Sequence, residues 1–170
     1  MRKRRGIALI LVLMVFGVLF SSCSKDKKDE DDKKYTIGIT QYVQHDALDS
    51  ARKGFVDGLS EEGYKEGENI VFDYENAQGD ISIAQTISNQ FVSNKVDMIF
   101  AIATPSLQSA YNATNDIPIV FTAVTDPIEA GVAESWDASG TNVTGTSDMV
   151  SMDQQLNLLL SLTKDIKTIG

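Results

Sequence analysis

The sequence predicts an α/β protein in which a parallel sheet has helices on both of its faces. From Tyr35 onward, short apolar runs alternate with longer amphipathic stretches. The run from Val96 to Ile102 is almost continuously apolar, as expected for a strand that is covered on both faces. When strand and helix alternate strictly, the crossovers are right-handed and the strands lie parallel.

Short runs rich in β-branched and aromatic residues define the predicted strands. Pro118 is acceptable because it falls near the start of its run, where no central ladder bond is lost. The predicted strands are residues 35–41, 70–74, 96–102, 117–121 and 142–145, and a last one begins within 166–170.

Apolar residues at helical spacing define the helices between these strands. In the first helix Asp46 is the expected N-cap, Phe55 and Leu59 lie on the apolar face, and Gly63 ends the helix in a left-handed turn. Asp80 is the expected cap of the second helix. The remaining helices are predicted over residues 105–113 and 152–162.

The chain begins like an exported protein. Residues 1–22 combine basic residues at positions 2–5, an apolar run of 14 positions from Ile7 to Phe20, and two serines. That run is shorter than the ~20 residues that span a bilayer, so it is read as a signal peptide. Cys23, the only cysteine, follows directly and resembles the acylated cysteine of a bacterial lipobox, which makes it the expected lipidation site.

The charge of the rest of the chain excludes nucleic acid as a partner. Residues 23–34 are so rich in charge that they are expected to form a disordered tether. Beyond them six basic and 19 acidic side chains remain, a net charge of −13. A surface of that sign repels phosphate backbones.

Candidate ligand contacts lie in four loops, because open parallel sheets bind ligands beyond the carboxyl ends of their strands. These loops are residues 41–46, 103–106, 122–127 and 145–148. The candidate ligand-binding residues are Gln41, His45, Thr104, Ser106, Thr122, Thr125, Asp126 and Asp148.

Several of these residues also have a purely structural explanation. A helix that starts at Pro105 offers free amide groups to a carboxylate, aided by Thr104 and Ser106, yet Thr104 can equally be just the cap. Asp126 can receive a ligand ammonium or start a turn with Pro127. His45 can face the ligand or help to cap the first helix, with capping favoured.

No enzyme signature is present in the sequence. It contains neither a dinucleotide-binding glycine motif, nor a P-loop, nor a nucleophile elbow. One histidine and one cysteine cannot build an ordinary transition-metal site, so we expect neither metal nor cofactor.

Six stretches in order resemble the ABC transporter substrate-binding family that includes tryptophan-binding lipoproteins. They are residues 39–49 (ITQYVQHDALD), 51–55 (ARKGF), 76–80 (NAQGD), 101–106 (AIATPS), 117–127 (IPIVFTAVTDP) and 142–145 (NVTG). The resemblance runs from Tyr35 to Gly170 and implies the type I periplasmic binding protein fold, with two α/β lobes around a cleft. Residues 35–145 would form the first lobe, and residues 146–170 the crossover and an incomplete start of the second.

The resemblance also implies a function. The implied protein is a bacterial receptor outside the cytoplasm, monomeric and anchored to the membrane. It binds an amino acid, aromatic ones included, between its two lobes. The lobes close over the ligand by a hinge motion, and the closed receptor delivers the ligand to an ABC permease. In that case the loop Thr104–Ser106 holds the carboxylate and Asp126 the ammonium. A sensor that feeds a signalling partner and a sugar or nucleoside receptor are alternatives within the same fold, and a flavodoxin-like enzyme is the weakest one.

Overall fold

The computed structural model describes residues 34–162 of the chain. The chain divides into two units, residues 1–33 and 34–170, and only the second contains described residues. The predicted signal peptide, Cys23, nearly all of the predicted tether and the strand expected after Ile166 therefore lie outside the described part.

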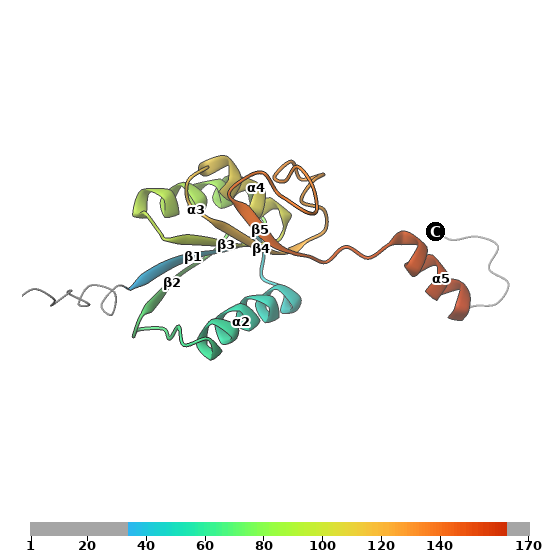
Figure 1. The fold of residues 1–170 in the computed structure, drawn as a ribbon, viewed down its shortest axis with the longest axis horizontal. Helices are drawn as coiled ribbons and strands as arrows, with labels where there is room; N and C mark the ends of the chain where they lie inside the picture. The colour runs from blue at the N-terminus through green and yellow to red at the C-terminus, as the bar shows by residue number, and fades with distance from the viewer. Residues whose placement is uncertain (1–33, 163–170) are drawn as a thin grey trace, which may run out of the picture. The chain divides into compact units, whose positions relative to one another are not determined.

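Five strands form one sheet in which every neighbouring pair is parallel (Figure 1). The spatial order is β2-β1-β3-β4-β5, so β1, β3 and β4 lie in the interior and β2 and β5 form the edges. The strands are β1 (Tyr35–Gln41), β2 (Ile70–Asn76), β3 (Met98–Ile102), β4 (Ile119–Val124) and β5 (Val143–Ser147). This arrangement confirms the predicted parallel sheet.

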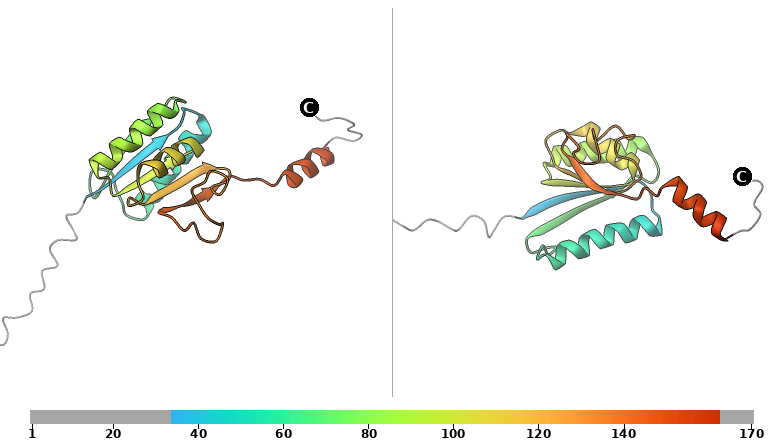
Figure 2. Two further views of the ribbon diagram at one scale, coloured as in Figure 1. Left: turned by 90° about the horizontal axis from the view of Figure 1, so that it is seen from above. Right: turned by 45° about the vertical axis from the view of Figure 1, so that its right-hand side comes forward.

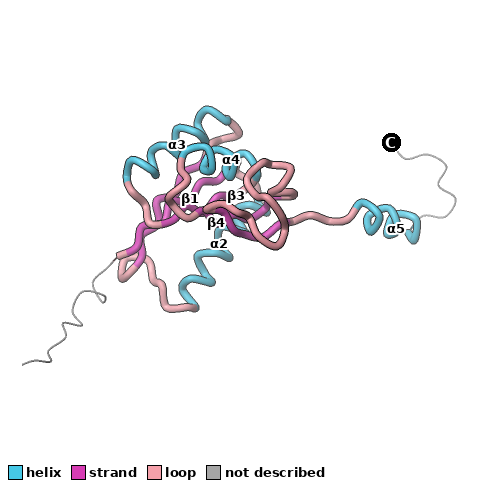
Figure 3. Tube along the Cα trace, turned by 45° about the horizontal axis from the view of Figure 1, so that its top comes forward, coloured by secondary structure: helices cyan, strands magenta, loops and turns pink. Residues whose placement is uncertain are grey.

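Helices cover the sheet on both faces, as predicted (Figures 1, 2 and 3). Helix α2 (Asp46–Glu61) lies on one face, and α3 (Ile81–Asn94) and α4 (Thr104–Ala113) lie together on the other. A further helix, α5 (Met152–Leu162), has the predicted bounds and buries none of its residues.

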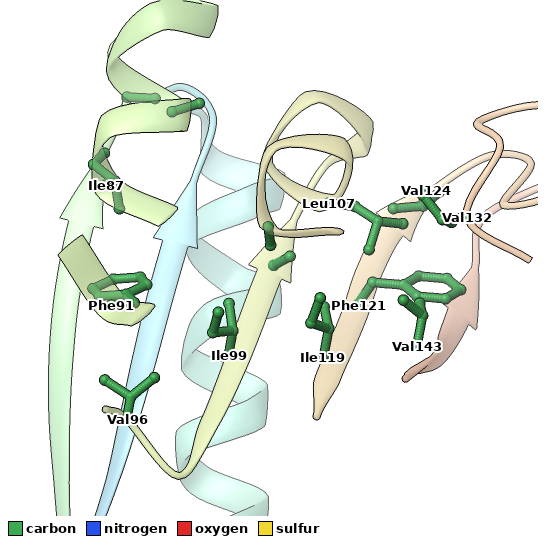
Figure 4. Packing of buried hydrophobic residues seen from close by; sticks show 14 residues of the cluster. Ile87, Phe91, Val96, Ile99, Leu107, Ile119, Phe121, Val124, Val132 and Val143 are labelled. Atoms are coloured by element: carbon green, nitrogen blue, oxygen red, sulfur yellow. The ribbon is translucent and has the colours of Figure 1, made fainter. Parts of the chain in front are cut away.

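Each face of the sheet has its own apolar core. Under α3 and α4, Phe91 and Leu107 are fully buried against strand residues such as Ile99 and Ile119 (Figure 4). Under α2, the rings of Phe55 and Phe100 stack with their centroids 3.8 Å apart. Fully burying one such side chain contributes about 1.5–3 kcal/mol, so these two clusters account for much of the stability of the unit.

Of the two N-cap residues predicted for α2 and α3, the structure confirms one and contradicts the other. Asp80 caps α3 as predicted, and its carboxylate accepts from the amides of Ser82 and Ile83. The prediction that Asp46 caps α2 was wrong, because Asp46 is already the first helical residue and His45 is the cap. An imidazole nitrogen can accept an amide hydrogen bond as a carboxylate does, which is why a residue outside the usual cap set performs the task.

The strict alternation of strand and helix fails between β4 and β5. These two parallel strands are joined by residues 125–142, which contain no helix. Side chains hold this connection instead, with Thr141 Oγ1 donating to the carbonyl of Val132 and Asn142 Nδ2 donating to that of Ile117. Pro118 lies just before β4, so its missing N–H removes no bond from the strand, and its carbonyl accepts from Ile99 N.

Gly38 in β1 is predicted to be irreplaceable because its strand lies against the ring of Phe91. A Cβ atom at Gly38 would stand 2.6 Å from Cδ2 of Phe91, which is itself fully buried. Gly38→Ala should therefore lower the free energy of unfolding by about 1–3 kcal/mol, measured by urea denaturation. The control is Gly54→Ala in α2, where a Cβ meets nothing within 4 Å. This control should be neutral or stabilising by up to ~1 kcal/mol, and an equal loss in both variants would contradict the packing argument.

Candidate functional site

The carboxyl ends of the central strands lie side by side and form what we call the rim, made of residues 41–46, 103–106, 122–127 and 145–148. In the strand register Gln41 of β1 stands opposite Ile102 of β3, which stands opposite Thr122 of β4. Backbone bonds extend this row past the ends of the strands, with Tyr42 N donating to Ile102 O and Ala103 N to Thr122 O. Val124 of β4 in turn stands opposite Ser147 of β5, so all four loops lie along one edge of the sheet.

The buried side chain of Gln41, at the end of β1, fixes the first loop of the rim by hydrogen bonds. Its side chain is fully buried, and Nε2 donates to the carbonyl of Val43 at 2.9 Å and to Oδ1 of Asp49 at 2.8 Å. The hydroxyl of Tyr74 donates to Oε1 at 3.4 Å. Since a buried amide must have partners, these contacts explain why glutamine ends the strand, and they fix the loop that leads into α2.

The side chain of Ser106, in the second loop of the rim, is also buried and hydrogen-bonded. Its side chain is fully buried, and its hydroxyl accepts from Thr40 Oγ1 at 3.4 Å. This contact joins the first turn of α4 to the end of β1. The serine hydroxyl thus positions the start of the helix, which presents its amide groups at the rim.

His45 occupies the cap of α2, as the favoured interpretation predicted. Nδ1 accepts from the amide of Ala47 at 3.2 Å, and the residue is exposed. Capping by a side-chain acceptor satisfies one of the amides that the first helical turn leaves unpaired.

Ala103 begins α4 in a backbone conformation that alanine rarely adopts. Its φ is 78° and its ψ is 154°, and it is the N-cap of α4 without a side-chain cap bond. The alternative in which Thr104 caps this helix was therefore wrong, because Thr104 is the first helical residue. The first intrahelical bond runs from Leu107 N to Ala103 O, so the amides of Thr104 and Ser106 have no partner within the helix.

A second alanine, Ala123 near the end of β4, also has positive φ, at 55°. Strained residues of this kind cost of the order of 1–3 kcal/mol and cluster at functional sites. Both lie at the rim on neighbouring strands. Sequence reasoning missed them because alanine, unlike glycine, carries no signal of a left-handed backbone.

The third and fourth loops are linked by their hydroxyls and carboxylates. Thr125 Oγ1 donates to Oδ1 of Asp148 at 3.0 Å, and Thr146 Oγ1 donates to Oγ1 of Thr122 at 3.2 Å. Thr125 and Asp148 are both exposed, whereas Thr122 is half-buried. These bonds tie the connection after β4 to the connection after β5.

Asp126 starts a turn, as one of its two interpretations predicted. Its Oδ1 accepts from the amides of Ile128 at 2.8 Å and Glu129 at 3.0 Å. The other oxygen, Oδ2, has no hydrogen-bond partner among residues 34–162. A turn-forming carboxylate of this kind keeps one oxygen free to accept from a ligand.

The rim therefore offers two kinds of polar group. Gln41 and Ser106 are buried and hold the loops, whereas Thr104, Thr125 and Asp148 are partly or fully accessible. Free amides at a helix start favour an anion, and carboxylate oxygens favour a cation. Chemically, this combination suits a zwitterion.

The described part of the chain offers neither a metal cluster nor a membrane span. Residues 34–162 contain no group of three or more His, Cys, Asp or Glu side chains placed to hold a metal ion. Within the same range, no helix combines the length and the apolar character that a membrane crossing needs.

Solved structures of similar proteins define the class as a lobe of a periplasmic binding protein. One is the ligand-free, open structure of a substrate binding protein with adhesive properties from Clostridium difficile, at 54% identity and a TM-score of 0.72. Another, from Streptococcus pneumoniae in complex with L-Trp, has 41% identity and a TM-score of 0.72. Each match covers 75% of this chain and 43% of the other.

The family follows from the sequence matches. The model of the family described as ABC transporter substrate binding protein matches residues 36–170. The chain belongs to this family. It is also 47% identical over 180 residues to the tyrosine-binding protein of Clostridioides difficile, a match that covers 100% of this chain and 52% of that protein. The chain thus spans about half the length of its relative.

The strain at Ala103 leads to a prediction. Ala103→Gly should raise the free energy of unfolding by about 1 kcal/mol, because glycine adopts positive φ without steric cost. Ala101→Gly, two residues earlier in β3 and without positive φ, should instead lower it by at least ~0.5 kcal/mol. Urea unfolding of both variants gives the comparison. Destabilisation by Ala103→Gly would mean that the backbone there is unstrained.

Proposed function

We propose that the chain is the N-terminal lobe of an extracytoplasmic solute receptor that serves an ABC importer and binds an amino acid, aromatic ones included. Membership of the substrate-binding family and the names of the relatives support this role. The observation that carries it is the rim, where accessible donors and acceptors from separate loops converge at the carboxyl ends of neighbouring parallel strands.

The ligand carboxylate would lie at the start of α4. The unpaired amides of Thr104 and Ser106 point out of the first turn, and the helix dipole adds about 0.3–1 kcal/mol for an anion. The hydroxyl of Thr104 can donate a further bond, whereas that of Ser106 is engaged with Thr40 behind the loop.

The ligand ammonium would lie at the third and fourth loops. Oδ2 of Asp126 can accept from it while Oδ1 keeps the turn in place. Asp148, held by Thr125, is a second acceptor, and Thr122 lies beside Thr146 at the edge of the same group. In this arrangement Gln41 and His45 contribute by fixing the first loop.

The role of the whole protein would be binding, without catalysis or a cofactor. A second lobe would close over the rim when the ligand is present, and the permease would recognise the closed, monomeric receptor. An acyl chain on Cys23, with residues 24–34 as a tether, would keep the receptor at the outer face of a membrane. Because the negative lobe needs no lipid contact of its own, anchor and binding site would work independently.

Binding is tested by isothermal titration calorimetry of the protein as purified from its host, with L-tyrosine and L-tryptophan. Asp126→Asn should weaken binding about tenfold or more, because asparagine keeps the oxygen that accepts from Ile128 and Glu129 but loses the charge that attracts the ammonium. Asp116→Asn removes an exposed charge outside the rim and should leave affinity unchanged. Absence of heat with both L-tyrosine and L-tryptophan, or equal affinity for the Asp126→Asn protein, would refute the proposal.

Anchoring is tested by growth of the host with radiolabelled palmitate. We expect label in the wild-type protein and none in a Cys23→Ser variant, which should leave the membrane fraction because it lacks the acyl chain. A Ser22→Ala variant, which keeps the cysteine, serves as the control. Equal membrane retention of wild-type and Cys23→Ser proteins would exclude a lipid anchor at this position.

A further inference from the structure

A fifth loop, residues 77–80, adjoins the rim after the edge strand β2. In the parallel register β2 ends opposite Gln41 of β1, so the chain leaves both strands at the same edge of the sheet. Ala77 N donates to Gln41 O at 2.9 Å. Gly79 N donates to Tyr42 O at 2.8 Å, and the Gly79 carbonyl accepts from the Tyr42 hydroxyl at 2.6 Å. These three bonds make the fifth loop part of the rim, although none of the candidate ligand contacts lies in it.

Gln78, in the middle of this loop, has a positive φ of 54°. Its backbone is held by Asn76, whose Oδ1 accepts from the Gln78 amide at 2.8 Å. Ala103 and Ala123, at the ends of β3 and β4, share the positive φ, so such residues follow three strands along one edge of the sheet. Elsewhere in the described part of the chain, the one further non-glycine residue of this kind is Lys95, which is the C-cap of α3. Since strained residues cluster at functional sites, the backbone marks Gln78 as part of the site.

The side-chain amide of Gln78 is exposed and free to bind. It forms no hydrogen bond with any residue in the described part of the chain, so a donor and an acceptor are both available. It lines an open hollow of about 660 Å³ together with Val43 and Gln44 of the first loop. The two charged residues in the same lining, Asp49 and Arg52, have opposite signs. This end of the rim therefore suits an uncharged polar group better than an ion.

The proposed amino-acid site leaves one direction along the rim for the side chain of the ligand. The ligand carboxylate would lie after β3, and the ammonium after β4 and β5. In the order β2-β1-β3-β4-β5, the opposite direction leads across β1 to the fifth loop. Neighbouring strands are about 4.7–4.9 Å apart, so β2 lies roughly 10 Å from β3. An aromatic side chain with a polar atom at its far end spans this distance when a hydrogen bond is added at each side.

We propose that Gln78 binds the polar group on the side chain of an aromatic amino acid, namely the phenol hydroxyl of tyrosine. The inference rests on the proposed function, because it extends the same site. Oε1 of Gln78 accepts from the hydroxyl, or Nε2 donates to it. Val43, with 39% of its surface exposed, offers an apolar neighbour for the ring. Gln78 thereby distinguishes tyrosine from phenylalanine.

The test is isothermal titration calorimetry of the protein as purified from its host, with L-tyrosine and L-phenylalanine, which differ in the hydroxyl alone. The wild-type protein should bind L-tyrosine about fivefold to tenfold more tightly, because L-phenylalanine leaves the amide unpaired. Gln78→Ala should weaken L-tyrosine by about that factor and change L-phenylalanine by less than about twofold. Gln90→Ala removes an exposed amide from α3 and should leave both affinities unchanged.

Gln78→Gly is a second variant with the same expected result. Glycine removes the amide and adopts positive φ without steric cost, so the loop keeps its conformation. Equal affinity of the wild-type protein for the two amino acids, an unchanged preference in both variants, or an equal loss of both ligands would overturn the inference and leave the amino-acid site in place. Absence of heat with both ligands would instead remove the proposed function, and this inference with it.

Discussion

In-register parallel pairing of β1, β3 and β4 is the constraint on which the rest of the structure depends. Because Gln41, Ile102 and Thr122 stand in one row, the three chains leave the sheet at the same edge and their loops meet. A shift by one residue would turn every side chain to the opposite face, exchanging the apolar core under α2 with that under α3 and α4. The two cores therefore determine the register, and the register determines the rim.

The polar side chains of the rim divide by burial. Gln41 and Ser106 are fully buried. Gln41 donates to Asp49 of α2, and Ser106 accepts from Thr40 of β1, so these polar groups hold the loops and the helix starts in place. What remains for a ligand is mainly backbone amides and short side chains on loops. The positive φ of Ala103 turns the chain from β3 into α4, which leaves the first amides of the helix unpaired at the rim.

Much of this architecture could be predicted from the sequence, because apolar period, caps and turn residues are local signals. The strands, the bounds of α5 and the cap at Asp80 are examples. The rim itself followed from one topological rule. The strain at Ala103 and Ala123 had no local signal, and neither did the inward direction of Gln41, which depends on Asp49 and Tyr74 from other elements. The connection between β4 and β5, to which the sequence assigned no helix, is anchored by the bond from Asn142 Nδ2 to the carbonyl of Ile117, 25 residues away, which no local pattern shows.

The most direct measurement is a crystal structure of the whole protein grown with its amino-acid ligand. Our account predicts density for the ligand beyond the ends of β3, β4 and β5, with its carboxylate against the amide of Thr104 and its ammonium near Oδ2 of Asp126. A ligand bound elsewhere on this lobe, with the first turn of α4 still open to water, would contradict it.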